Sequence, residues 1–213
     1  TGKDLSDFVV NGRQVPFHLI DIVDPDQEFS VFEYQQRFYN SFAKISSAGG
    51  SLPFLVGGTG LYLESVLLGY RMTRVPADPE FARKLAGLDT IELTERLRRA
   101  KDSVHNVTDL RDRERLIRAI EIAEYSGRGE PALVEEPPAI DPFTIGVRVE
   151  RALLRKQIAL RLKRRLEAGM IEEVERLHAS GITWERLDRF GLEYRFVSRY
   201  LRGEMKYEEM FRL

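Results

Sequence analysis

The chain has 213 residues, of which 43% are hydrophobic and 31% charged, and a formal net charge of −1, so we expect one domain, or one domain with a modest insertion. It contains no cysteine and three widely separated histidines, which excludes disulfides, thiol nucleophiles and thiolate metal sites and argues against zinc. No apolar run approaches the ~20 residues that span a bilayer, and the N-terminus lacks a signal-peptide pattern; we therefore expect a cytoplasmic protein that does not bind membranes.

The N-terminal third alternates between predicted strands and helices. Residues 15–24 are mostly apolar with a proline at each edge, which predicts a short buried strand or extended segment. Ser30 is the expected N-cap of a helix, with Glu33 as its capping-box partner, and a Gly-Gly pair ends that helix. Residues 52–56 predict a second strand and residues 61–68 a second helix. This order favours a parallel sheet with crossover helices.

The turn between the second strand and the second helix contains Gly57, Gly58, Thr59 and Gly60. A strand, a glycine turn and a helix start bring free backbone N–H groups and a hydroxyl to one place, which suits an anion such as the phosphate of a ligand. The Thr59 hydroxyl could then hydrogen-bond a leaving oxygen. The alternatives are that glycine is present only because it tolerates positive φ, and that Thr59 is an ordinary helix N-cap.

The character of the sequence changes at Pro76. Helices are predicted at about 78–87, 90–103 and 108–126, with no strand pattern between them. This indicates a helical subdomain inserted into the strand–helix alternation. The elements expected after it are a return strand at 143–149, helices at about 151–167 and 171–179 with a break at Gly169, and a mainly helical stretch at 185–213.

A basic stripe is expected on the third helix of the insertion. At about 100° per residue, Arg111, Arg115 and Arg118 fall on one face, and Leu116 and Ile120 fall on another. Arginine binds phosphate oxygens bidentately, so such a stripe suits a nucleic-acid backbone. The alternative is a solvated helix face on which the arginines are interspersed with acidic residues.

Arg161 is expected to project within roughly 20° of Leu154, on the apolar side of its helix, which also carries Ile158. A guanidinium directed toward a core needs an anionic partner. That partner could be a structural carboxylate or a bound diphosphate, and the residues alone leave both open. Asp21 and Asp24 are candidate bases or members of an Asx-type turn.

Five motifs in order resemble those of the tRNA dimethylallyltransferase (tRNA isopentenyltransferase) family. Residues 16–25 resemble the family's P-x-H-L-I-D-x-x-x-P stretch, and residues 56–62 resemble its G-G-T-x-L-Y motif. Residues 115–121 resemble R-L/V-x-R-A-L/I-E, and residues 158–174 resemble the helix pair R-I/V-x-x-R-x-x-x-M-x-x-x-G-L-x-x-E-V. Residues 203–209 resemble G-x-x-x-Y-x-E. The ordered set spans nearly the whole chain and is more specific than any one motif.

The resemblance implies a reaction and a fold. Enzymes of this family transfer a dimethylallyl group from its diphosphate to N6 of an adenosine beside the tRNA anticodon, with Mg²⁺ as the usual helper. The implied partners are therefore dimethylallyl diphosphate and the tRNA anticodon arm. The implied fold is α/β, with a P-loop-NTPase-like, nucleotide-binding parallel-sheet core at 1–74 and 143–213 and a tRNA-binding helical insertion at 75–142. We expect a monomer.

The resemblance also implies roles for residues at the motif positions. Thr59 would contact the bridging oxygen of the diphosphate, and Arg161 would stabilise its charge, as the catalytic residues. Gly57, Gly58 and Gly60 would bind the diphosphate. The residues expected to contact tRNA are Glu114, Arg115, Leu116, Ile117, Arg118, Arg189, Tyr194 and Arg195.

Three departures accompany the resemblance. The family's P-loop, G-x-x-x-x-G-K-S/T, and its D-S-x-Q-V/I-Y stretch with the general-base Asp are absent, and residues 1–3 match the run just after that stretch. The C-terminal segment ending in K-R-Q is missing, and the G-Y-R/K motif occurs as G-L-E-Y-R at residues 191–195. We therefore expect an incomplete enzyme that is inactive alone. The alternatives are an isopentenyltransferase acting on free adenine nucleotides and a non-catalytic RNA-binding fragment.

Overall fold

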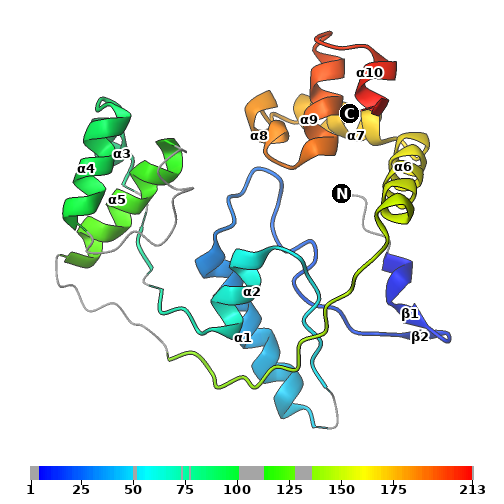
Figure 1. The fold of residues 1–213 in the computed structure, drawn as a ribbon, viewed down its shortest axis with the longest axis horizontal. Coiled ribbons are helices and arrows are strands. Elements are labelled where there is room, and N and C mark those ends of the chain that lie inside the picture. Colours follow the sequence, from blue (N-terminus) through cyan, green and yellow to red (C-terminus); the bar gives the residue numbers. More distant parts are fainter. Residues whose placement is uncertain are drawn as a thin grey trace. The chain divides into compact units, whose positions relative to one another are not determined.

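The computed structural model describes residues 5–49, 52–72, 74–76, 78–100, 113–127 and 136–212. Most of the regular structure is helical, and the chain divides into two compact units (Figure 1). The first unit comprises 1–29 and 142–213, and the second comprises 30–141. Within the described residues, no helix has both the length and the hydropathy needed to cross a membrane.

The first unit begins with a short hairpin. A 3₁₀ turn at Leu5–Phe8 leads into β1 (Val9–Val10), which pairs in antiparallel register with β2 (Arg13–Gln14). The two-residue loop is formed by Asn11 and Gly12, whose φ angles are 51° and 73°. Positive φ at both central residues is typical of a type I′ turn, for which Asn-Gly is the usual sequence. This hairpin is not among the predicted elements, although its turn carries the signal.

Five helices complete the described part of the first unit. They are α6 (Arg151–Glu167), α7 (Met170–Ala179), α8 (Trp184–Asp188), α9 (Leu192–Leu201) and α10 (Tyr207–Arg212). The predicted break at Gly169 is confirmed, because this glycine has a φ of 92° and forms the N-cap of α7. That left-handed conformation is easy for glycine and costly for other residues.

The core of the first unit is formed by α7 to α10 and their connections. Its buried residues are Met170, Val174, Ile182, Leu187, Tyr194, Val197, Met205 and Met210. Leu166, in the last turn of α6, packs against this core together with Trp184 of α8. Helix α6 contains no buried residue, so it is joined to the core through its C-terminal end.

The second unit contains two groups of helices. Helix α1 (Val31–Ser47) packs with α2 (Gly60–Leu67). In the other group, α5 (Arg113–Gly127) packs with α3 (Pro79–Ala86) and α4 (Thr90–Ala100). The core of this three-helix group consists of Leu85, Leu93, Leu97, Leu116 and Ile120. Over the described residues, these helices agree with the predicted ones.

The start of α1 confirms the predicted capping box. The amide of Glu33 donates to Ser30 Oγ at 3.2 Å, and the amide of Ser30 donates to Glu33 Oε2 at 2.9 Å. Farther along α1, the side chain of Gln35, which is 2% exposed, donates to the carbonyl oxygens of Ser65 at 2.6 Å and Tyr70 at 2.8 Å. This amide satisfies carbonyl groups at the end of α2 and thereby ties the two helices together.

The strands predicted at 15–24, 52–56 and 143–149 are not formed. No ladder pairs these residues with another described segment, and a strand needs such a partner for its backbone groups. The apolar side chains of 52–56 and 143–149 are mostly exposed instead, with 82% exposure at Phe54 and 91% at Phe143. The parallel sheet expected from the strand–helix alternation is therefore absent from the part of the chain that the structure describes.

Residues 15–24 bend where a strand was predicted. The φ angles of Leu19 and Asp21 are 61° and 51°, and positive φ interrupts an extended backbone. Asp24 then begins a β-turn with Pro25 in its second position, and its carbonyl oxygen accepts from the amide of Gln27 at 3.0 Å. This segment is a looped connection rather than a sheet element.

The compact units group residues 30–74 with the helical segment that follows them. The predicted domains, 1–74 with 143–213 and an insertion at 75–142, stay a prediction. Their core depends on a sheet that would connect the early and late parts of the chain.

Candidate active site

A cavity of about 850 Å³ lies in the first unit, lined by residues of the 23–29 segment, α6, α8 and α9. Its wall carries four arginines and two carboxylates, together with several aromatic side chains. Convergent cations beside apolar surface suit an anionic ligand that also has a planar or apolar part. The arginines are Arg161, Arg165, Arg186 and Arg189, the carboxylates are Asp24 and Glu193, and the aromatic residues are Phe29, Phe190, Tyr194 and Phe196.

Arg186 holds one edge of the cavity in place. Its Nε donates to the carbonyl oxygen of Pro25 at 3.0 Å, and its Nη2 donates to the carbonyl oxygen of Gln27. The guanidinium carbon also lies 5.5 Å from the centre of the Phe190 ring, within cation–π range. Arg186 is therefore committed to fixing the 24–27 turn beside α8.

Arg165 forms an ion pair with Glu193, and the exposed fractions of the two side chains are 10% and 32%. The Arg165 guanidinium carbon lies 5.7 Å from the centre of the Tyr194 ring. Its Nη2 has no hydrogen-bond partner among the described residues. The pair links the last turn of α6 to the first turn of α9.

Tyr194 is buried, with 5% exposure, and its hydroxyl donates to Glu173 Oε1 at 2.6 Å. Burial, followed by the hydrogen bond to Glu173, raises the pKa of Tyr194 to about 12. The phenol is therefore neutral at physiological pH, and its proton is already donated within the protein.

Arg161 lines the same cavity. The expectation that it is directed toward a packed core is wrong, because α6 has no buried residue and the neighbouring Leu154 and Ile158 are 43% and 58% exposed. Of the two partners considered for this guanidinium, a structural carboxylate is not found among the described residues. Arg161 therefore faces the cavity as a cation that a ligand can use.

Thr59 is the N-cap of α2, yet its hydroxyl does not cap the helix. Its main-chain oxygen instead accepts from two amides of the first turn, at 3.1 and 3.2 Å. None of Gly57, Gly58 and Gly60 has a positive φ, and a Cβ atom added at Gly58 or Gly60 would meet nothing within 4 Å. The positive-φ explanation of the glycines is therefore not supported, and Thr59 occupies the N-cap position without a side-chain capping bond. Its exposed backbone and hydroxyl are open to a ligand.

Thr59 and Arg161 belong to different compact units. Their joint action on one diphosphate therefore stays a prediction.

Only part of the basic stripe expected on α5 is exposed at the surface. Arg111 lies outside the described residues, and Arg115 is exposed. Arg118 donates from Nη1 to Glu121 Oε2 at 2.9 Å and from Nη2 to the carbonyl oxygen of Val75 at 2.5 Å, and its side chain is 40% exposed. Arg118 therefore fastens α5 to the segment that enters the three-helix group.

The other face of α5 packs as predicted. Leu116 and Ile120 are both 0% exposed, and Ile117 is half-buried against the same core. Burial gives Leu116 a packing role, which differs from its expected role as an RNA contact. Glu114, Ile117 and Arg118 line a groove of about 360 Å³ against α3.

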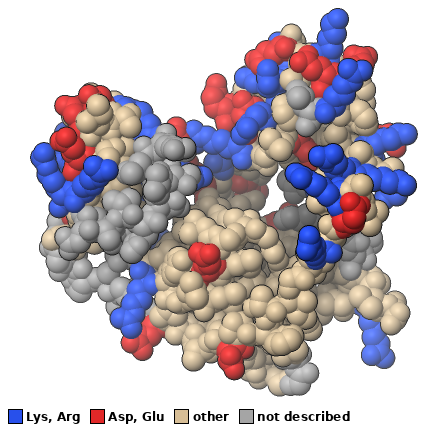
Figure 2. All heavy atoms as spheres, in the orientation of Figure 1, with Lys and Arg blue, Asp and Glu red and all other residues tan. Residues whose placement is uncertain are grey.

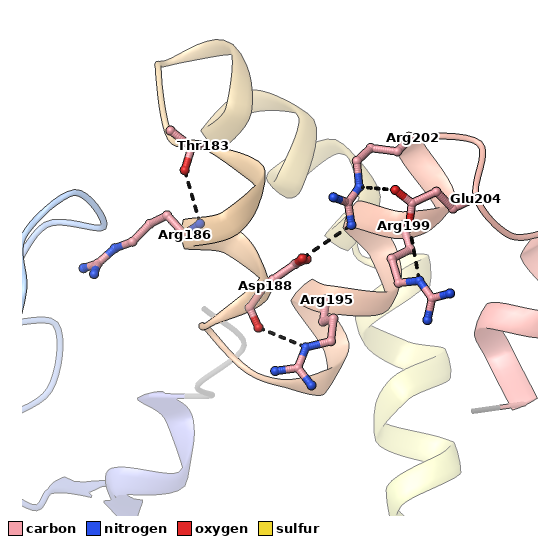
Figure 3. Close-up of polar contacts among 7 residues, drawn as sticks. All are labelled: Thr183, Arg186, Asp188, Arg195, Arg199, Arg202 and Glu204. Carbon is pink, nitrogen blue, oxygen red and sulfur yellow. Dashed lines mark hydrogen bonds and ion pairs between the residues drawn. The ribbon is translucent and has the colours of Figure 1, made fainter. Parts of the chain in front are cut away.

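Charged side chains link α8 to α9 and to the turn that follows α9 (Figure 3). Arg202 lies 3.4 Å from Asp188 Oδ2 and 3.0 Å from Glu204 Oε1, and Arg199 lies 3.4 Å from Glu204 Oε2. Arg195 donates from Nε to the main-chain oxygen of Asp188 at 3.2 Å. The exposed Arg195 is thus oriented by α8.

The described surface is unevenly charged. In the face drawn in Figure 2, Lys, Arg, Asp and Glu crowd the C-terminal helices, whereas the area over α1 and α2 is mostly uncharged. Among the residues that the structure describes, no group of three or more His, Asp or Glu side chains could hold a metal ion.

Three charged cavity residues escape the sequence prediction, namely Arg165, Arg186 and Glu193. Arg165 follows Arg161 by four positions, so helical spacing could have placed both on one face. No local signal in the sequence connects Arg186 with the Pro25 carbonyl group that it binds, because the two residues are 161 positions apart.

Comparison with known proteins gives a consistent result. A family model described as IPP transferase matches residues 10–213. Over 99% of its length, this chain is 54% identical to tRNA dimethylallyltransferase 1 of Syntrophus aciditrophicus and 51% identical to tRNA dimethylallyltransferase 2 of Citrifermentans bemidjiense, covering 68% and 66% of those proteins. The crystal structure of the full-length tRNA isopentenylpyrophosphate transferase from Bacillus halodurans is similar, with a TM-score of 0.58 and 28% identity over 99% of this chain and 68% of that one. The chain thus spans about two thirds of these relatives.

Proposed function

Because the chain belongs to the IPP transferase family, we propose that it forms most of a tRNA dimethylallyltransferase. This enzyme transfers a dimethylallyl group from dimethylallyl diphosphate to N6 of an adenosine next to the tRNA anticodon and releases diphosphate. The observation that carries the proposal is 54% identity to a tRNA dimethylallyltransferase over 99% of this chain. The relatives are named for action on tRNA, so free adenine nucleotides and a non-catalytic role are not favoured.

The chemistry determines what the site must supply. The bond between the allyl carbon and the diphosphate oxygen breaks, a carbon–nitrogen bond forms at N6, and that nitrogen loses a proton. The allyl carbon becomes electrophilic as diphosphate leaves, so stabilising the departing oxygens is the main requirement.

We assign this stabilisation to Thr59 and Arg161, with Gly57, Gly58 and Gly60 binding the diphosphate through backbone amides. The support for Thr59 is that its hydroxyl is not used to cap α2. The support for Arg161 is that it lines a cavity rich in arginine without a carboxylate partner among the described residues.

Mg²⁺ is proposed as the ion that accompanies the diphosphate. Proteins usually hold Mg²⁺ through one or two carboxylates together with substrate phosphates. Among the described residues no cluster of three such ligands occurs, so most of the coordination would come from the diphosphate and water.

Contacts with tRNA are proposed on both units. On α5 they involve Glu114, Arg115, Ile117 and Arg118, with Leu116 packing the helix behind them. Near the cavity they involve Arg189, Tyr194 and Arg195. Two of these, Arg189 and Tyr194, line the cavity that Arg161 also lines, which suits a target base held beside the reacting diphosphate, since such a base must leave its stack.

The finer architecture is part of the same proposal. We propose a P-loop-like core at 1–74 and 143–213 with a parallel sheet, a tRNA-binding insertion at 75–142, and a monomeric cytoplasmic protein. The exposed apolar side chains at 52–56 and 143–149 support the sheet, because pairing and packing in a sheet would remove them from water.

The test is a transfer assay with the full-length protein, dimethylallyl diphosphate, Mg²⁺ and unmodified tRNA, followed by digestion and mass spectrometry of the nucleosides. We expect isopentenyladenosine in tRNAs that have adenosine next to the anticodon. Excess AMP or ADP should compete poorly. No product with several such tRNAs would contradict the proposal.

A further inference from the structure

The ion pair between Arg165 and Glu193 lies on the wall of the arginine-lined cavity. Both residues line it together with Arg161. The Arg165 side chain is 10% exposed and is shielded by the Tyr194 ring, whose centre lies 5.7 Å from the guanidinium carbon. The Tyr194 hydroxyl cannot serve Glu193 at the same time, because it donates to Glu173 at 2.6 Å.

Glu193 presents an electrostatic problem for any anion in this cavity. A carboxylate on the wall repels a diphosphate and competes with it for nearby guanidinium groups, and partial burial strengthens both effects because water screens them less. Glu193 is 32% exposed, so solvent screens it only in part. Neutralising the charge of Glu193 therefore makes the cavity more favourable for an anion.

We propose that Arg165 is a positioning residue that neutralises Glu193, so that Arg161 remains available to the diphosphate. This inference rests on the proposed function. Arg165 acts by compensating the charge of Glu193, and it does not need to touch the ligand. Its Nη2 is buried, which agrees with such an indirect role.

The competing explanation is that the ion pair only clamps α6 to α9. Removing each charge separately and then both together distinguishes the two explanations. Arg165→Met removes the cation while keeping a long side chain, and methionine is the residue that the motif quoted for 158–174 has at this position. Glu193→Gln removes the anion with little change of shape. If charge is what matters, the double variant recovers what the single Arg165 variant loses; if the clamp matters, it does not.

The experiment is a calorimetric titration of the full-length protein and its variants with inorganic diphosphate in the presence of Mg²⁺. We expect Arg165→Met to weaken binding of diphosphate about tenfold. This is the order of repulsion expected from the uncompensated carboxylate of Glu193 in a partly solvated cavity. The double variant should return to within about threefold of the wild type, and Glu193→Gln alone should bind equally or more tightly. Arg155→Met, the same substitution on the exposed face of α6, should bind like the wild type.

Each other outcome has a distinct meaning. A double variant as weak as Arg165→Met, or an Arg165→Met variant that binds normally, overturns the inference. If the wild type does not bind diphosphate, or if Arg161→Ala does not weaken it, the proposed function itself fails at this site. A further outcome is that the variants leave diphosphate binding unchanged, while binding of an anticodon stem-loop RNA weakens in Arg165→Met and recovers in the double variant. In that case the ligand is an RNA phosphate and the diphosphate assignment is wrong.

Discussion

Replacing Tyr194 by phenylalanine should destabilise the first unit. Phenylalanine keeps the ring, which is 5% exposed in the core, and removes only the hydroxyl that donates to Glu173 at 2.6 Å. A hydrogen bond to a carboxylate contributes about 1.5–3 kcal/mol, and its loss leaves the carboxylate less well solvated. We therefore expect the free energy of unfolding to fall by about 2 kcal/mol at neutral pH.

The alkaline range gives a second, independent signature of the same hydroxyl. The pKa of Tyr194 is about 12 in the folded protein, against about 10 for an unperturbed tyrosine. Between these values the unfolded chain releases the phenolic proton while the folded protein keeps it, so this contribution to stability is complete below pH 10 and is lost as the pH rises to 12. The wild type should lose at most about 2–3 kcal/mol more than Tyr194→Phe over that interval.

Urea unfolding followed by tryptophan fluorescence measures both effects. Trp184 is the only tryptophan of the 213-residue chain and packs against the core that contains Tyr194. Tyr207→Phe, at a side chain that is 42% exposed, is the matched control. If the wild type and Tyr194→Phe lose the same stability between pH 10 and 12, burial and the hydrogen bond to Glu173 do not raise the pKa of Tyr194, and the reasoning is refuted.

Three further substitutions test other parts of the structure. Leu116→Ala should lower the stability of the three-helix group by about 3–5 kcal/mol, measured by circular dichroism in urea, because Leu116 is fully buried; a loss below about 1 kcal/mol would contradict its place in the core. Ser30→Ala should cost about 1 kcal/mol and speed amide exchange in the first turn of α1, whose capping box it breaks; unchanged exchange there would count against the cap. Thr59→Ala should lower turnover by about one to three orders of magnitude with tRNA affinity unchanged, and Thr59→Ser should retain activity; an equal loss of tRNA affinity would refute the assigned role.

Local rules predicted the helices well. The capping box at Ser30, the helix break at Gly169 and the packing face of α5 all depend on contacts within a few residues, which a sequence contains in full. The Asn-Gly turn of the hairpin is equally local and was recoverable from the same kind of signal.

The strands were not predictable in the same way. Alternating or continuous apolar residues at 52–56 and 143–149 indicate what a strand would bury, but a strand forms only when a neighbouring chain segment pairs with it. Among the described residues no such neighbour is present. Pattern alone therefore identified the segments, and their pairing in a sheet stays a proposal.

The candidate site was predicted in part. Motif positions identified Arg161, Arg189 and Tyr194, which the structure brings to one cavity. Helical geometry alone gave Arg161 the wrong surroundings, because it assumed that the apolar side of α6 is packed, and α6 has no buried residue. The role of Glu193 depends on a partner from another helix, which spacing along the chain does not reveal.

The tether from Arg186 to the carbonyl oxygens of Pro25 and Gln27 has a consequence for how the chain matures during synthesis. Residues 30–141 form one unbroken compact unit, so they can assemble while the C-terminal helices are still being translated. Residues 23–29 must wait for a partner 161 positions later, and closing so long a loop is entropically slow. The arginine-lined cavity is therefore completed only after α8 has been synthesised, because one of its edges depends on Arg186.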